Sequence, residues 1–343
     1  MKIGISVGYS GSKMTLPIKR VQRAEELGID SIWASETYGS DAITPLAYIA
    51  ALTKRVKLGT GIAQLAARTP ANLAMCAQTI DAMAGEGRMI VGLGVSGPQI
   101  VEGWYGQPWG RPNTRLRDYV AIMKKIWKRE GPVVHEGKEI SLPYRGPGAS
   151  GLGKPLKSIL HGNPDIPVYL GTSTDTNVRM TAEIADGWIG MHLGPGSLKK
   201  YMPLIKEGLA RRKDGKSIDD FTIRGTLSIV MDDDVRRALD IRKRAVALYA
   251  GGMGAKEKNF HKDCMIERGY ADAAERVQEL FLAGRQDEAA NAVPDEYVDD
   301  ENLIGPPERI KARWKPWLDS GVTMMCFTQP TDEALEVIGK LPR

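Results

Sequence analysis

Strand-like and helix-like segments alternate along the whole chain. The predicted strands are eight short apolar runs at residues 3–7, 31–34, 57–61, 89–93, 167–170, 187–191, 222–230 and 322–327. Apolar residues between them recur at helical spacing, as in Leu116, Tyr119, Val120, Met123 and Trp127. This alternation predicts a parallel sheet with crossover helices. Eight such units in 343 residues favour a closed α/β barrel of the TIM (β/α)8 type, formed as one domain over residues 1–343.

Two long segments interrupt the alternation. Residues 130–165 are rich in glycine and proline and precede the fifth predicted strand. Residues 251–303 mix a glycine-rich start with helical pieces and precede the eighth strand. Long insertions in barrel enzymes often lie over the carboxyl ends of the strands. We therefore expect both insertions at that face, where they would cover a substrate.

The composition limits the classes of partner. The net charge of +5 is mild and its basic residues are dispersed, which gives no indication of nucleic-acid binding. No stretch approaches the roughly 18 apolar residues of a membrane span, and the first residues enter a strand directly. The three cysteines and four histidines lack metal-ligand spacing. We expect a cytoplasmic protein with a small-molecule substrate, buried free thiols and no metal, membrane or nucleic-acid partner.

Glycines cluster where the third and fourth predicted strands end. The two stretches are Leu58-Gly59-Thr60-Gly61-Ile62 and Val91-Gly92-Leu93-Gly94-Val95-Ser96-Gly97. Small residues at such positions let a planar ligand lie close to the backbone. The second stretch also matches the dinucleotide fingerprint, which needs a helix at its last glycine and an acidic strand-end residue about 20 positions later. Pro98 and the Gly-rich residues 103–108 interrupt such a helix, and Asp118 lies in a helical pattern, so we favour the barrel.

The predicted strand ends are polar but contain few groups that could transfer a proton. Only Glu36 and His192 stand out, whereas acid–base enzymes usually need several tuned groups. A cofactor is therefore expected to supply the difficult chemical step. Residues 171–177 follow an apolar strand and precede a helix, a setting that can hold a phosphate. Ordinary capping of that helix by Thr174 or Asp175 is the alternative.

Several motifs together resemble one enzyme family. They are Trp33-Ala34-Ser35-Glu36, Gly59-Thr60-Gly61-Ile62 with Arg68-Thr69-Pro70, Gly92 to Gln99 with Glu102-Gly103-Trp104, Ala185-Asp186-Gly187-Trp188, and Gly305-Pro306-Pro307-Glu308-Arg309-Ile310. Their order and spacing resemble the luciferase-like monooxygenase superfamily. The resemblance is to its branch of oxidoreductases that use the deazaflavin coenzyme F420, such as the methylenetetrahydromethanopterin reductases.

The resemblance implies a TIM-like barrel with the deazaflavin at the carboxyl ends of the strands. It implies a cis peptide bond at Gly61-Ile62 behind the ring, and it places Glu36 where the family usually has an aspartate near the ring. The residues implied in cofactor binding are Glu36, Thr60, Gly61, Ile62, Arg68, Ser96, Gly97, Gly171, Thr172, Ser173 and Asn177. Among them, the loop at residues 171–173 would hold the phosphate, and Arg68 would receive the acidic tail. The Gly-Pro that is frequent in this loop is replaced by Ser173-Thr174.

The resemblance also suggests the type of reaction. The sugar-phosphate dehydrogenases of the family have a catalytic histidine at the position of Thr37, so this chain is not expected to oxidise a sugar phosphate. We expect a reductase, in which a hydride passes from the deazaflavin C5 to an organic substrate. Glu36, His192, Tyr9 or water would deliver the proton.

Three other functions remain open from the sequence. An FMN-dependent monooxygenase of the same superfamily would share the fold and the phosphate loop. A non-catalytic flavin-binding protein would share the glycine-rich strand ends that contact the cofactor. A barrel enzyme without a redox cofactor would use only the phosphate loop. The resemblance further implies a homodimer packed through barrel helices.

Overall fold

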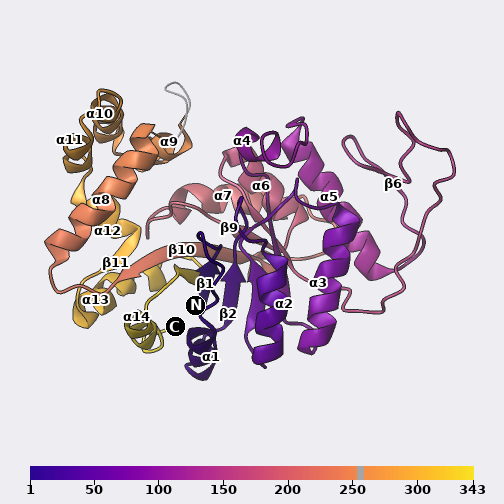
Figure 1. Cartoon of the computed structure of the whole chain (residues 1–343), viewed down its shortest axis with the longest axis horizontal. Helices are drawn as coiled ribbons and strands as arrows, with labels where there is room; N and C mark the ends of the chain where they lie inside the picture. The colour runs from indigo at the N-terminus through magenta and orange to yellow at the C-terminus, as the bar shows by residue number, and fades with distance from the viewer. Residues whose placement is uncertain (253–258) are drawn as a thin grey trace.

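The computed structural model describes residues 1–252 and 259–343, and within them eight parallel strands form a closed barrel (Figure 1). The strands in order around the barrel are β1 (Lys2–Gly8), β2 (Ser31–Ala34), β3 (Lys57–Thr60), β5 (Met89–Gly94), β8 (Val168–Gly171), β9 (Gly187–Ile189), β10 (Thr222–Val230) and β12 (Met324–Thr328). β12 pairs with β1, which closes the ring. Each strand end lies within two residues of its predicted position, and the predicted TIM barrel is confirmed.

Helices surround the barrel. They are α1 (Ile18–Glu26), α2 (Ile43–Leu52), α3 (Pro70–Ala84), α5 (Pro112–Lys128), α6 (Asp175–Ile184), α7 (Leu198–Leu209), α13 (Pro307–Leu318) and α14 (Asp332–Ile338). The predicted apolar face of α5 is buried, including Leu116, Met123 and Trp127. In the described residues, no helix has both the length and the apolar character needed to cross a bilayer.

Bulky side chains fill the barrel interior below the carboxyl ends of the strands. This cluster contains Trp33, Ile90, Tyr169, Ile189, Met324 and Cys326. A Cβ added at Gly59 would lie 2.4 Å from the Trp33 ring, so Gly59 is required for the indole to fit. Gly59 therefore serves the packing of the barrel and not the ligand site that the glycine-rich stretch suggested.

A helical segment lies beside the carboxyl ends of the strands (Figure 1). It consists of α8 (Val235–Gly252), α9 (Phe260–Glu267), α10 (Ala271–Leu282), α11 (Gln286–Asn291) and α12 (Asp295–Asp300). Its helices pack around a separate cluster of buried apolar residues that includes Leu239, Val277 and Val298. β11 (Asn302–Ile304) then pairs with the end of β10. The insertion predicted at residues 251–303 thus begins earlier, with α8, and residues 253–258 lie outside the described part.

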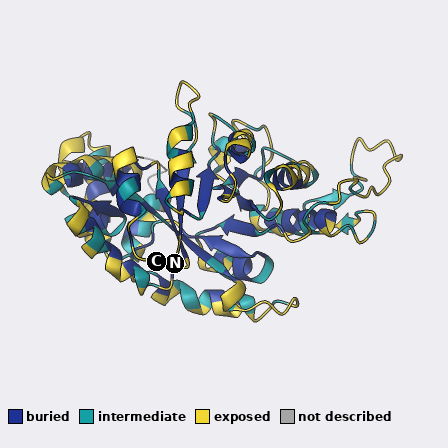
Figure 2. Ribbon diagram, turned by 90° about the horizontal axis from the view of Figure 1, so that it is seen from below, coloured by how far each residue is buried: buried dark blue, intermediate teal, exposed yellow. Residues whose placement is uncertain are grey.

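The other insertion, residues 130–165, lies on the outer side of the barrel. It contains a short hairpin of β6 (His135–Glu136) and β7 (Ser141–Leu142). Asp118 of α5 anchors it, because the Asp118 carboxylate accepts hydrogen bonds from the Glu139 and Ile140 amides at 2.8 and 3.0 Å. Figures 1 and 2 show this exposed segment projecting away from the helical segment. The expectation that it covers the substrate is wrong, since it connects the end of α5 to the start of β8 and so departs from the opposite face.

Candidate functional site

A cavity of about 660 Å³ opens at the carboxyl ends of the strands. One wall consists of small and apolar residues from the β3, β5 and β8 ends, namely Gly61, Ile62, Gly94, Val95 and Gly171. The facing wall carries hydroxyl groups from β1, β10 and β12, namely Ser6, Thr226, Ser228 and Thr328. The helical segment lines the cavity with Arg242, Tyr249 and His261, of which only His261 belongs to the insertion predicted at residues 251–303. The size and the division of the walls suit a planar ring and a second small molecule.

Ile62 forms the centre of the apolar wall. The Gly61-Ile62 peptide bond is cis, as the family resemblance implied. The Ser35 hydroxyl donates a hydrogen bond of 2.8 Å to the Gly61 carbonyl. A Cβ on Gly94 would lie 2.8 Å from Ile62 Cγ1, and a Cβ on Gly171 would lie 3.2 Å from Ile62 Cγ2. The two glycines therefore let Ile62 lie flat against the ends of β5 and β8, and the wall stays shallow enough for a ring.

Thr60 lies behind this wall and does not line the cavity. Its hydroxyl donates to the Gly92 carbonyl and accepts from the Gly92 amide, both at 2.8 Å. A Cβ on Gly92 would lie 1.9 Å from the Thr60 carbonyl oxygen. Thr60 and Gly92 thus join the strands β3 and β5, and Thr60 supports the predicted cofactor site from outside the cavity.

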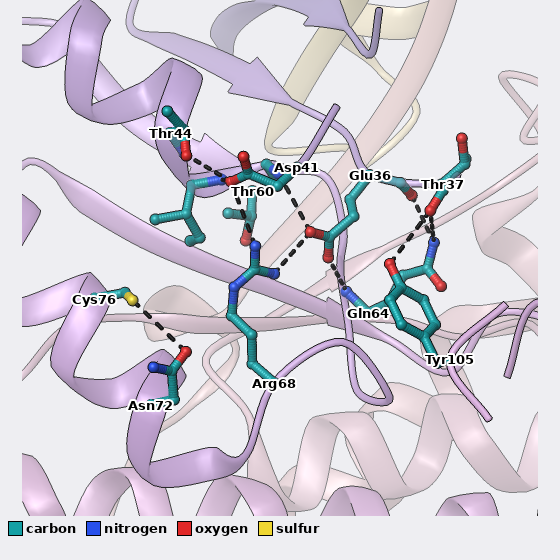
Figure 3. A network of polar contacts seen from close by, with 12 residues as sticks. Glu36, Thr37, Asp41, Thr44, Thr60, Gln64, Arg68, Asn72, Cys76 and Tyr105 are labelled. Carbon is teal, nitrogen blue, oxygen red and sulfur yellow. Dashed lines mark hydrogen bonds and ion pairs between the residues drawn. The ribbon is translucent and has the colours of Figure 1, made fainter. Parts of the chain in front are cut away.

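Glu36 lines the cavity but is fully engaged by protein groups (Figure 3). Its carboxylate accepts a hydrogen bond of 2.7 Å from Arg68 Nη1 and one of 2.9 Å from the Gln64 amide. The Gln64 side chain in turn donates to the Glu36 carbonyl at 2.9 Å. Because these donors hold the carboxylate, Glu36 acts as an anchor of the cavity wall. Sequence reasoning did not identify Gln64, whose position after the cis bond was the available signal.

Arg68 points into a pair of carboxylates and does not line the cavity. Its Nη2 also lies 3.3 Å from Asp41 (Figure 3). Burial alone would lower the pKa of Arg68, but the nearby Glu36 and Asp41 carboxylates raise it. Burial alone would raise the pKa of Asp41. Hydrogen bonds from Thr44 and Ile43, together with the charge of Arg68, lower it. The structure therefore does not place Arg68 where the predicted cofactor tail would meet it.

The predicted phosphate loop divides into groups that face the cavity and groups that stabilise α6. Gly171 lines the cavity. The Thr172 hydroxyl shares a hydrogen bond of 2.8 Å with the Thr181 hydroxyl, and Thr174 caps α6 by accepting from the Asn177 amide. The alternative of helix capping is thus observed. Ser173 is half-buried at the start of the loop, and Asn177 Oδ1 is buried without a partner among the described residues.

Ser96 and Gly97 occupy different positions. Ser96 lines the cavity with a φ of 67°, in the left-handed region, while Gly97 precedes the one-turn helix α4 (Pro98–Val101) and does not line the cavity. A short helix does begin at Pro98, contrary to the expectation that this residue prevents one. This helix ends after four residues, and the strand before it, β5, belongs to a closed barrel. The glycine-rich stretch is therefore not a dinucleotide-binding turn of a Rossmann fold.

His192 meets two groups from the helical segment at the edge of the cavity. His192 Nδ1 lies 3.1 Å from Glu301 Oε2, and His192 Nε2 lies 3.1 Å from His261 Nδ1. Burial alone would raise the pKa of Glu301, but hydrogen bonds from His192 and Arg268 lower it. Burial, with the nearby His192, lowers the pKa of His261 to about 4. Sequence reasoning missed His261 and Glu301, because their contact with His192 depends on how the helical segment folds back.

Comparison with known proteins agrees with this architecture. The family model described as luciferase-like monooxygenase matches residues 8–324. A protein of Mycobacterium tuberculosis, provisionally named a coenzyme F420-dependent oxidoreductase, is 43% identical over 343 residues, covering 99% of both chains. The 5,10-methylenetetrahydromethanopterin reductase of Archaeoglobus fulgidus is 27% identical over 325 residues, covering 93% of this chain and 92% of the relative.

A solved structure shows the same fold. The coenzyme F420-dependent tetrahydromethanopterin reductase from Methanopyrus kandleri superposes with a TM-score of 0.78 at 23% identity, covering 99% of this chain and 97% of that one. The family model spans nearly the whole barrel, and the relative at 43% identity is aligned over the full chain. The chain belongs to the luciferase-like monooxygenase family.

Proposed function

We propose that this chain is a coenzyme F420-dependent oxidoreductase that works as a reductase on a small organic substrate. The observation that carries the proposal is the cavity with one smooth wall, built from Gly61, Ile62, Gly94 and Gly171. The name of the relative at 43% identity supports F420 as the cofactor.

The residues present fit a deazaflavin. When bound, the deazaflavin supplies a hydride from its C5. Ile62 and the neighbouring glycines would support a flat ring, Ser96 lies on the same wall, and Gly171 begins the loop that would hold the phosphate. The buried Asn177 Oδ1 can accept a hydrogen bond from a hydroxyl group of the cofactor side chain.

His192 is the better proton donor of the two catalytic candidates. Glu36 is held by Arg68 and the Gln64 amide, whereas His192 lines the cavity and contacts Glu301 and His261. The Glu301 carboxylate lies 3.1 Å from His192 Nδ1 and so orients the imidazole. His192 has a φ of 52°, and asparagine tolerates this conformation better than alanine. His192→Asn is therefore the suitable variant, and it should slow reduction of the substrate while leaving deazaflavin affinity unchanged.

Equilibrium binding tests the proposed cofactor. The purified chain is titrated with coenzyme F420 and, separately, with FMN, and cofactor fluorescence is recorded. Saturable F420 binding with much weaker FMN binding is expected. Tight FMN binding with no F420 binding would support the FMN-dependent monooxygenase instead. Oxidation of reduced F420 in the presence of a panel of electrophiles then distinguishes an enzyme from a non-catalytic binding protein. The homodimer stays a prediction, which light scattering on the purified chain can check.

A further inference from the structure

Arg224 lies at the floor of the cavity as a buried cation. Its side chain comes from β10, lines the cavity, and is only 4% exposed. The Arg224 Cζ lies 4.3 Å from the centre of the Trp33 ring, and a Cβ on Gly61 would lie 3.5 Å from Nη2. The guanidinium thus reaches across the barrel from the hydroxyl-bearing wall to the foot of the Ile62 wall.

The groups around this guanidinium are neutral. Nη1 lies 3.4 Å from the Thr226 hydroxyl, and Nε is buried with no hydrogen-bond partner. Among the described residues, no carboxylate lies within 4.0 Å of it. Cys326 shares a hydrogen bond with Arg224, but burial raises the pKa of this thiol, so it carries no compensating charge at neutral pH. Burial likewise raises the pKa of the nearby Tyr169.

Arg88 shows how the same chain satisfies a buried arginine that has only a structural role. Arg88 is 6% exposed and also lacks a carboxylate partner among the described residues. Its guanidinium donates to the carbonyls of Val56, Thr53 and Ala84 at 2.9, 3.0 and 3.1 Å, and to the Thr53 hydroxyl at 2.6 Å. Arg224 has no comparable set of acceptors. A buried charge without such partners is costly, which indicates that a ligand completes its environment.

A second arginine gives the cavity the same sign of charge. Arg242 of α8 lines the cavity from the helical cover and has no ion pair among the described residues. The two carboxylates that line the cavity are already paired, Glu36 with Arg68 and Glu301 with Arg268. The charges left for a ligand are therefore positive, with Arg224 at the floor of the cavity and Arg242 on its helical side.

We propose that Arg224 binds a carboxylate group of the substrate, so that the substrates of this chain are carboxylic acids. A guanidinium can hold a carboxylate through two parallel hydrogen bonds, and the Thr226 hydroxyl lies beside it. Arg242 adds a second positive charge on the helical side of the same cavity. Calling this carboxylic acid a substrate depends on the proposed function, but the binding of the carboxylate does not.

The test compares a charged probe with its uncharged isostere in the absence of any cofactor. Cinnamate and cinnamamide are titrated into the full-length protein by calorimetry. Cinnamate is expected to bind about tenfold or more tightly than cinnamamide, as for a charge-assisted hydrogen bond. Equal affinities for the two probes would overturn the proposal, and this comparison needs no variant.

Variants then locate the site. Arg224→Met should lower cinnamate affinity by about tenfold or more, and Arg224→Lys should retain part of it, because lysine keeps the charge without the planar fork. Arg244→Met, which removes an exposed arginine of the same helix as Arg242, is the control and should bind cinnamate as the wild type does. Unchanged cinnamate binding by Arg224→Met, together with a loss of F420 affinity, would overturn the proposal and assign the guanidinium to the cofactor. If the wild-type protein binds cinnamate but does not bind F420, only the proposed function is rejected.

Discussion

Arg68 Nη1 lies 2.7 Å from Glu36 Oε1, and this ion pair is shielded from water, since the two side chains are 17% and 3% exposed. Removing one partner of such a pair leaves an uncompensated charge. We expect Glu36→Gln to lower the free energy of unfolding by about 3 kcal/mol, at the lower end of the range for buried pairs because Asp41 still contacts Arg68. Urea denaturation followed by circular dichroism measures this loss.

Asp41→Asn provides the matched control. Asp41 also contacts Arg68, but its side chain is 37% exposed, so the loss should stay below about 1 kcal/mol. If the two variants were destabilised equally, the ion pair would not be the main support of this wall.

Gly92 and Gly94 should respond differently to the same substitution. In Gly92→Ala the new Cβ would meet the Thr60 carbonyl, which cannot move without breaking the strand pairing, so we expect a loss of at least about 3 kcal/mol in unfolding free energy. In Gly94→Ala the atoms nearest the new Cβ would be those of the Ile62 side chain, which can move. That variant should fold and bind the deazaflavin about tenfold more weakly, because Ile62 is pushed into the ring site.

Thermal melting and F420 titration of the two variants separate these effects. A Gly94→Ala protein with wild-type F420 affinity would show that Ile62 does not support the ring. A Gly92→Ala protein as stable as the wild type would contradict the role given to Gly92 in joining β3 and β5.

The loop after β8 allows a test of which hydroxyl serves the cofactor. The Thr172 hydroxyl is bonded to Thr181, so Thr172→Val should cost about 1 kcal/mol of stability and leave F420 affinity unchanged. Ser173→Ala should instead weaken F420 binding with little change in stability, if Ser173 contacts the phosphate as proposed. The reverse pattern, measured by fluorescence titration and urea denaturation, would place Thr172 at the phosphate.

The sequence predicted the barrel well because its periodicity is local. β2 was located to the residue, since a short apolar run bounded by polar residues leaves little choice of where the strand begins and ends. The insertion at residues 130–165 was misplaced because its composition says nothing about which end of the barrel it leaves. Its position in the chain does give the end: a segment between a helix and the next strand lies at the face of the barrel where the strands begin.

The site was harder to predict because several of its members act through distant contacts. Gly61 and Ile62 were found through the glycine-rich strand end and the family resemblance, whereas the pairing of Arg68 with Glu36 depends on how the chain turns after β4 (Ala63–Gln64). His261 comes within 3.1 Å of His192 although 69 positions separate them. Arg224 carried a signal that could have been used, as a charged residue within a strand whose neighbours are mostly apolar.

The contact between His192 and His261 should make the free energy of unfolding depend on pH. Burial, together with the charge of His192, lowers the pKa of His261 from 6.5 to about 4, so the folded state favours the neutral imidazole. Between about pH 6.5 and 4 the unfolded chain therefore binds more protons at this residue, and its contribution to stability falls as the pH falls through this window. Urea midpoints measured at pH 7 and pH 4.5 should differ less in His261→Gln than in the wild type. The exposed His161→Gln serves as the control and should keep the wild-type difference. A His261→Gln protein with the full wild-type pH dependence would assign the effect to other groups, such as the Asp41 and Glu301 carboxylates, whose lowered pKa values also favour folding above the acidic range.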